Sequence, residues 1–165
     1  LTGIKRSLTD GGIRVPLIAW WPQTIAPQRV SKQVGYFGDF MATAAELAGV
    51  TVPPQCDSLS LLPTLIDLPH KQAEHEFLYW EFHERGFQQA ALYRGRWKAI
   101  RRSSATAPVV LYDLETDVAE SRDVAAEYPE IAAKLGAYLL QARSPSPDWE
   151  PQWSAAPRAV NSSVN

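Results

Sequence analysis

Two cations and two hydroxyl side chains stand close together near the start of the chain. Lys5 and Arg6 come directly before Ser7, and Thr9 follows two positions later. Ammonium, guanidinium and hydroxyl groups all donate hydrogen bonds, so this combination is suited to binding an anion. Gly11-Gly12 then permits a tight turn or a close approach of the backbone. The residue types therefore predict an anion-binding loop at this point of the chain.

A second group of polar side chains lies on a predicted strand, residues 77–83. Its side chains alternate, so one face is apolar and the other carries Tyr79, Glu81 and His83. Such a polar face either meets water or lines a pocket, and the pattern leaves both alternatives open. Gln88, at the start of the next predicted strand, is a further candidate for contact with a substrate.

The sequence predicts no metal site. The spacing of His70, His75 and His83 fits no common zinc pattern, and Cys56 is the only cysteine. We therefore expect His70 and His75 in a solvated loop and Cys56 as a packing or loop thiol. A single cysteine also excludes a disulfide within the chain.

The composition bounds the class of protein. The 165 residues have room for one ordinary domain or two small subdomains, and 45% hydrophobic residues with six Trp provide a core. A net charge of -2 gives no reason to expect a nucleic-acid partner. No apolar run reaches the ~20 residues of a membrane-spanning helix. The chain opens at Leu1, inside a motif, so we expect a piece of a longer protein.

The elements that must position these residues follow from periodicity and turn signals. An apolar segment over 14–22 predicts a buried strand, and Asp39 is expected to cap a helix that stops at Gly49. Strands are predicted over 77–83, 88–94, 97–101 and 109–114. Short connections make them an antiparallel meander, and a helix beginning near Pro129 is expected to cover its apolar face.

These strings, in this order, resemble the formylglycine-dependent sulfatases of the alkaline-phosphatase-like superfamily. The resemblance rests on Lys5, Asp10-Gly11-Gly12, Ile13-Arg14-Val15-Pro16, Trp21-Pro22, Asp57-Ser58-Leu59-Ser60-Leu61-Leu62-Pro63, Leu78-Tyr79-Trp80-Glu81, Ala91-Leu92-Tyr93-Arg94-Gly95-Arg96-Trp97-Lys98 and Leu111-Tyr112-Asp113-Leu114. Asp10 stands where the family usually has Glu, and Ser58 where it usually has Gly. The resemblance covers roughly residues 3–143.

The resemblance implies an α/β fold in which residues 1–70 end the catalytic domain. Residues 71–145 would form a subdomain with a four-stranded antiparallel sheet and a packed helix, and 146–165 a tail. It implies that Lys5 contacts the sulfate, that His83, Glu81 and Gln88 border the substrate, and that this substrate is a sulfated small molecule or glycan. Formylglycine and calcium would belong to a missing N-terminal sulfatase portion, because Cys56 lacks the Cys-x-Pro-x-Arg pattern.

Three functions remain open at this stage. The first is the C-terminal part of a sulfatase, inactive alone, in a periplasmic or secretory compartment. The second is a phosphate or phosphonate ester hydrolase of the same superfamily. The third is a non-catalytic module that binds a glycan or a partner subunit.

Overall fold

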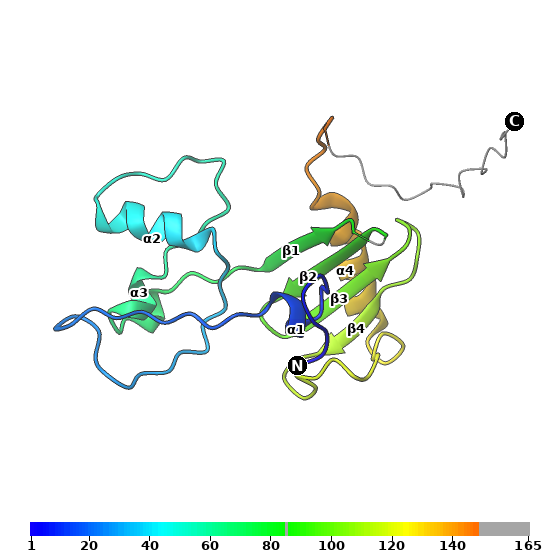
Figure 1. Ribbon diagram of the computed structural model, residues 1–165, viewed down its shortest axis with the longest axis horizontal. Coiled ribbons are helices and arrows are strands. Elements are labelled where there is room, and N and C mark those ends of the chain that lie inside the picture. Colours follow the sequence, from blue (N-terminus) through cyan, green and yellow to red (C-terminus); the bar gives the residue numbers. More distant parts are fainter. Residues whose placement is uncertain (85, 149–165) are drawn as a thin grey trace, which may run out of the picture. The chain divides into compact units, whose positions relative to one another are not determined.

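A four-stranded antiparallel sheet forms the second half of the chain in the computed structural model, which describes residues 1–84 and 86–148 (Figure 1). The strands run in the order β1 (Phe77–Phe82), β2 (Gln88–Tyr93), β3 (Trp97–Arg102) and β4 (Val110–Asp113). Each neighbour in sequence is also a neighbour in space, as the short connections predict. The predicted meander is therefore confirmed, with strand ends shifted by one residue in places.

The register of β3 against β4 assigns the side chains to two faces. Ala99 lies opposite Leu111, and Ile100 lies opposite Val110. Because side chains alternate along a strand, Lys98 and Ile100 share one face, while Ala99 and Arg101 share the other.

Residues at the start of the chain cover the face that carries Ile100. Leu8 packs there with Ile100 and Tyr112 in one buried cluster. A short helical turn, α1 (Asp10–Ile13), follows Leu8. The remaining members of the cluster are Ala90 and the half-buried Ile13, Trp80, Phe82, Val110 and Leu114. The apolar side chains of β1 therefore face the N-terminal segment.

The helix α4 (Pro129–Gln141) covers the opposite face, which carries the buried Ala99 and Leu111, so the predicted packed helix is confirmed (Figure 1). Arg101 Nη2 donates to the carbonyl of Gly136 at 3.0 Å, and Gln89 Nε2 donates to that of Leu139 at 2.9 Å. Contacts between distant residues set this placement. Residues 1–14 occupy the other face, and the side chains of Arg101 and Gln89 bind α4 to the face that it covers.

In the sequence, three short helices come between α1 and β1: α2 (Asp39–Leu47), α3 (Leu62–Leu65) and the 3-10 helix η1 (Pro69–Lys71). The predicted helix at Asp39 is confirmed. Gly49 adopts φ +67°, the left-handed conformation expected at its end. The carboxylate of Asp39 does not cap its own helix, because it accepts a hydrogen bond from the backbone N–H of Tyr36 instead.

The apolar segment after Arg14 is not a buried strand among the described residues. No strand is assigned from Val15 to Trp21, and the side chains of Ile18 and Trp20 are 88% and 85% exposed. A strand requires a neighbouring backbone with which to exchange hydrogen bonds. Within the described part of the chain this segment has none.

Contacts divide the chain into two units. One combines residues 1–14, 79–92 and 96–165, and the other combines 15–78 and 93–95. Much of the expected tail, 146–165, lies outside the described residues. Among those described, no helix combines the length and the apolar character needed to cross a membrane.

Candidate functional site

Lys5 stands at the tip of a tight turn formed by residues 4–7, which we call the cationic turn. The backbone N–H of Ser7 donates to the carbonyl of Ile4 at 2.9 Å, and Arg6 adopts φ +79°. Lys5 is exposed. Lys5 forms no ion pair with any residue in the described part of the chain. An exposed ammonium on a defined turn can bind an anion without first breaking another contact.

Gly11 and Gly12 allow the backbone to close tightly behind the cationic turn. The N–H of Gly11 donates to the carbonyl of Thr2 at 2.7 Å, and the N–H of Gly12 donates to that of Thr9 at 2.8 Å. A Cβ atom at Gly11 would lie 2.3 Å from the carbonyl oxygen of Gly3, and one at Gly12 would lie 2.1 Å from that of Ser7. The predicted close backbone approach at this glycine pair is confirmed.

The residue before the two glycines is anchored inside the protein. Asp10 Oδ1 accepts a hydrogen bond from Lys98 Nζ at 2.6 Å, and Lys98 Nζ lies 2.8 Å from Glu120 Oε1. The backbone N–H of Asp10 donates to Glu120 Oε2 at 2.6 Å. The side chains of Lys98 and Glu120 are 1% and 0% exposed. The buried ion cluster of Asp10, Lys98 and Glu120 therefore joins the N-terminal segment to β3 and to the turn after β4.

The loop between β1 and β2 lies beside the cationic turn. Arg6 Nε forms an ion pair with Glu84 Oε2 at 2.7 Å. Lys5 precedes Arg6, and His83 precedes Glu84, so this pair joins the two segments that carry these predicted site residues. The ring of His83 also packs edge-on against Phe87, with 4.7 Å between the ring centroids.

Glu81 lies in a polar cluster on the face of the sheet that α4 covers. Its Oε2 accepts a hydrogen bond from the Tyr79 hydroxyl at 2.8 Å and lies 3.3 Å from Arg143 Nε. Its Oε1 lies 3.2 Å from His83 Nε2. Burial, followed by the hydrogen bond to Glu81, raises the pKa of Tyr79 far above the usual tyrosine value. The polar face of β1 is therefore partly buried, and Glu81 orients His83.

Gln88 is separated from this cluster. It begins β2, is half-buried, and shares a face with Ala90, on the side of the N-terminal segment. The structure therefore brings Glu81 and His83 into contact on the face that α4 covers. Gln88 lies on the other face, on the side of the N-terminal segment that carries Lys5.

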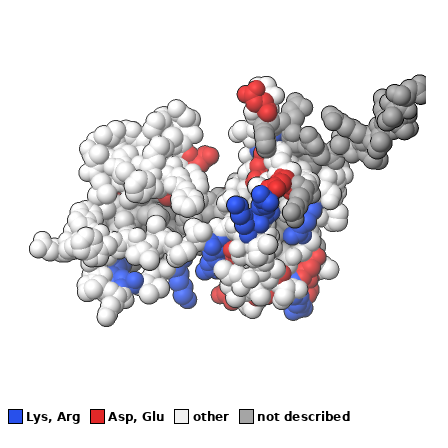
Figure 2. Space-filling model, viewed as in Figure 1, with Lys and Arg blue, Asp and Glu red and all other residues white. Residues whose placement is uncertain are grey.

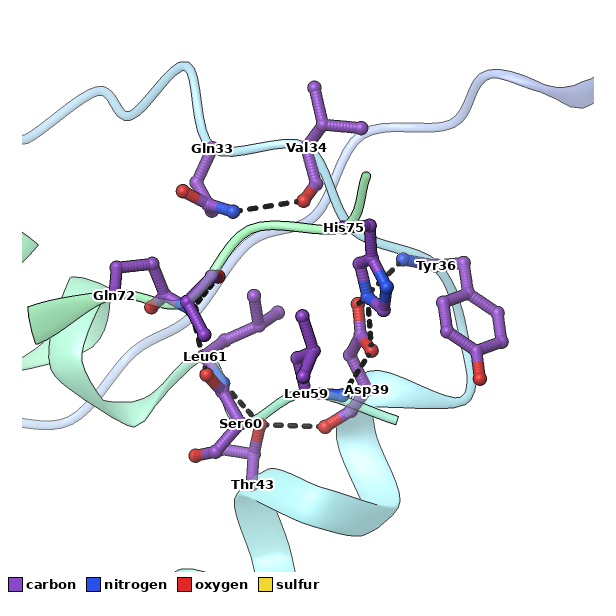
Figure 3. A network of polar contacts seen from close by, with 11 residues as sticks. Gln33, Val34, Tyr36, Asp39, Thr43, Leu59, Ser60, Leu61, Gln72 and His75 are labelled. Atoms are coloured by element: carbon purple, nitrogen blue, oxygen red, sulfur yellow. Dashed lines mark hydrogen bonds and ion pairs between the residues drawn. The ribbon is translucent and has the colours of Figure 1, made fainter. Parts of the chain in front are cut away.

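A second polar network lies in the unit that contains α2 (Figure 3). His75 Nε2 lies 2.9 Å and 3.0 Å from the two carboxylate oxygens of the fully buried Asp39. The backbone N–H groups of Tyr36 and Leu59 donate to the same carboxylate at 3.0 Å and 2.9 Å. The expectation that His75 is solvated was wrong, because its side chain is only 10% exposed. The network joins the linker before β1 to α2.

Among the described residues, none forms a calcium site, and the only cysteine of the sequence lacks the pattern that precedes formylglycine. No three His, Cys, Asp or Glu side chains of the described residues are grouped as metal ligands. Cys56 is half-buried and is followed by Asp57-Ser58. A shallow pocket lined by Glu74, His75, Glu76 and Arg94 contains none of the predicted substrate contacts.

Sequence reasoning missed Lys98 and Glu120. One signal for Lys98 was available, since it is the single cation in the apolar run Trp97-Lys98-Ala99-Ile100. A charge within such a run is buried when its strand is covered on both faces, and it then requires a partner. No local pattern pointed to Glu120, which reaches the cluster through a turn with φ +52°.

Comparisons with known proteins relate this chain to sulfatases. The family profile described as N-sulphoglucosamine sulphohydrolase, C-terminal, matches residues 4–145. The chain is 37% identical to the N-acetylgalactosamine-6-sulfatase of Mus musculus over 97 residues, which cover 58% of this chain and 18% of that protein. It is 29% identical to the arylsulfatase K of Mus musculus over 139 residues, which cover 79% of this chain and 25% of that protein.

Two solved structures extend the comparison. A 2-O GAG sulfatase superposes with a TM-score of 0.51 at 28% identity, covering 63% of this chain and 23% of that one. A sulfatase-like protein of Bacteroides fragilis gives a TM-score of 0.57 at 15% identity, covering 74% and 27%, and this likeness concerns the fold alone. The chain thus spans about a quarter or less of the relatives that it matches.

Proposed function

Since this chain belongs to the N-sulphoglucosamine sulphohydrolase C-terminal family, we propose that it is the C-terminal part of a sulfatase that hydrolyses sulfate esters of sulfated sugars. The relatives named above include an N-acetylgalactosamine-6-sulfatase and a 2-O GAG sulfatase, both of which act on sulfated sugars by their names. The observation that carries the proposal is the exposed Lys5, held on a turn whose backbone is anchored in the protein interior.

Lys5 supplies positive charge to a sulfate oxygen in this proposal. A charge-assisted hydrogen bond of this kind contributes about 1.5–3 kcal/mol. The contact accelerates the reaction only if negative charge on that oxygen grows in the transition state. His83, oriented by Glu81, borders the sugar in this proposal. Gln88, on the face that the N-terminal segment covers, contributes an outer contact.

Formylglycine and calcium belong, in this proposal, to a catalytic portion outside these residues, in a periplasmic or secretory compartment. These 165 residues are then inactive alone. The exposed segment 15–21 supports such a portion, because its apolar side chains fall on both faces of an extended backbone. Strands of this type are covered on both faces in α/β sheets.

The exposed side of α2 supports the same arrangement. Phe40 is 77% exposed, and Met41 and Leu47 are also exposed. Over α2 and α3, most of the surface visible in Figure 2 is uncharged. A contiguous uncharged surface with large apolar side chains is typical of a surface that packs against another part of a protein.

Kinetics of the enzyme that contains this chain tests the role of Lys5. Lys5→Ala should lower kcat/KM for N-acetylgalactosamine 6-sulfate by about tenfold to a hundredfold. Lys32→Ala, at another exposed lysine, should leave kcat/KM within about twofold. An unchanged kcat/KM in Lys5→Ala would overturn the assignment.

The isolated chain tests the claim that it is inactive alone. It should hydrolyse 4-nitrophenyl sulfate no faster than its Lys5→Ala variant, and faster turnover contradicts the claim. In the whole enzyme, a kcat/KM for 4-nitrophenyl phosphate above that for the sulfate would favour a phosphoesterase instead. Salt-dependent binding to a glycan array, with no turnover by the whole enzyme, would favour a binding module.

A further inference from the structure

The buried ion cluster contains charged groups that the proposed substrate contact does not use. We propose that Lys98 is a positioning residue, which acts through Asp10 and Glu120 to hold the backbone that presents Lys5. This inference rests on the proposed function of Lys5. Its physical basis is that Lys98 lies on β3 of the rigid sheet, whereas Lys5 lies on a turn without regular structure of its own.

The charges of the cluster are balanced. Asp10 and Glu120 bring two negative charges to the single ammonium of Lys98. Arg14 Nη1 lies 3.4 Å from Asp10 Oδ2, the carboxylate oxygen that does not bind Lys98 Nζ. The buried ion cluster with the 58% exposed Arg14 is neutral in sum, which avoids an uncompensated buried charge that would be strongly destabilising.

Stability alone does not account for a buried lysine at this position. Removing an ammonium and two carboxylates from water costs several kcal/mol per ion, roughly as much as their attraction returns. Apolar side chains at such positions are often equally stable. What the ion cluster adds is a defined geometry, since the ammonium of Lys98 donates only to oxygens that lie within hydrogen-bond distance of Nζ. Asp10 is thereby fixed at one place on the sheet.

Backbone hydrogen bonds connect the fixed Asp10 to the turn that carries Lys5. The N–H of Asp10 donates to Glu120 Oε2, and the next N–H, that of Gly11, donates to the carbonyl of Thr2. The hydroxyl of Thr2 donates in turn to the carbonyl of Ala119, next to Glu120. Residues 2–11 therefore form a closed loop with both ends anchored at one point, and Lys5 lies at the outer edge of that loop.

Hydrogen exchange of the 165-residue chain tests the anchoring without any assay of activity. Lys98→Met should accelerate exchange at the amides of Gly11 and Gly12 by about tenfold or more. The control is Arg96→Met, which removes an ion pair with Asp113 at the end of the same strands. It should leave exchange at Gly11 and Gly12 near the wild-type rate. The inference fails if the two variants accelerate these two amides equally.

A second variant keeps the test decisive if Lys98→Met does not fold. Glu120→Gln retains the Lys98–Asp10 pair but replaces one of the two acceptor oxygens of Glu120 by an amide group that only donates. It should accelerate exchange at Gly11 by about threefold to tenfold, while exchange at Leu111 in β4 changes little. Equal changes at Gly11 and Leu111 would contradict the proposal.

A double-mutant cycle in the enzyme that contains the chain connects the anchoring to the substrate. If Lys98 acts through Lys5, then Lys98→Met should lower kcat/KM for the sulfated sugar in the wild-type background. In the Lys5→Ala background it should change kcat/KM by less than about twofold. Effects that multiply would refute the positioning role. A Lys5→Ala variant with unchanged kcat/KM would instead refute the proposed function, while the exchange data still decide the anchoring.

Discussion

Arg6 and Glu84 form an ion pair at 2.7 Å that joins the cationic turn to the loop between β1 and β2. The two residues are 78 positions apart in the sequence, and each follows a predicted site residue, Lys5 or His83. Both side chains are about half exposed. The pair therefore joins two surface segments, and its contribution to the free energy of unfolding is small.

Glu84→Gln should raise the KM for a sulfated sugar in the enzyme that contains this chain, by about twofold to fivefold at low salt. The free energy of unfolding should change by less than about 1 kcal/mol. The KM effect should decrease at about 1 M salt, where exposed charges are screened. Steady-state kinetics at two salt concentrations measures this, with Glu130→Gln on α4 as the control. A KM effect that is independent of salt would contradict it.

His75→Ala should lower the free energy of unfolding by about 1–3 kcal/mol, because the fully buried carboxylate of Asp39 loses its side-chain donor. Urea titration followed by fluorescence measures the loss. His70→Ala, at an exposed position in the same linker, should stay within about 0.5 kcal/mol of wild type. Equal losses in the two variants would show that the Asp39–His75 contact is not stabilising.

The Arg96–Asp113 pair should make the free energy of unfolding depend on pH in the acid range. Hydrogen bonds from Arg96 hold the pKa of Asp113 below its ordinary value of 3.8. Because the pKa is lower in the folded state, the stabilisation is present above pH 3.8 and is lost as the pH falls through the folded-state pKa. The urea midpoint of Arg96→Met should lie below that of wild type at pH 7, and the difference should narrow below about pH 4. A difference that stays constant with pH would exclude this linkage.

Tyr79 should make the free energy of unfolding depend on pH in the alkaline range. Burial raises its pKa above the ordinary value of 10.0, so the folded state favours the neutral phenol. That contribution is complete below pH 10 and is lost as the pH rises toward the folded-state pKa. From pH 9 to about pH 11, wild type should therefore lose more stability than Tyr79→Phe. Parallel pH profiles for the two proteins would contradict the assignment.

Local patterns predicted the regular elements because periodicity is a property of neighbouring residues. The alternation of residues 77–83 predicted β1, and the signals at Asp39 and Gly49 predicted the bounds of α2. The same information could not say which face of the sheet α4 covers. That choice depends on what occupies the other face, namely residues 1–14, which lie more than 60 positions away from β1.

The sequence by itself determined the four strands of the sheet, the helix α4, the family and the candidate Lys5. Only the tertiary structure decided that Lys98 and Glu120 meet Asp10, that Glu81 orients His83, and that Gln88 turns to the other face. The physical reason is the range of the interactions. Helix and strand periodicity arises within a few residues, whereas a buried charge finds its partner only where the folded chain brings distant residues within hydrogen-bond distance. For Lys98 and Asp10 that separation is 88 positions.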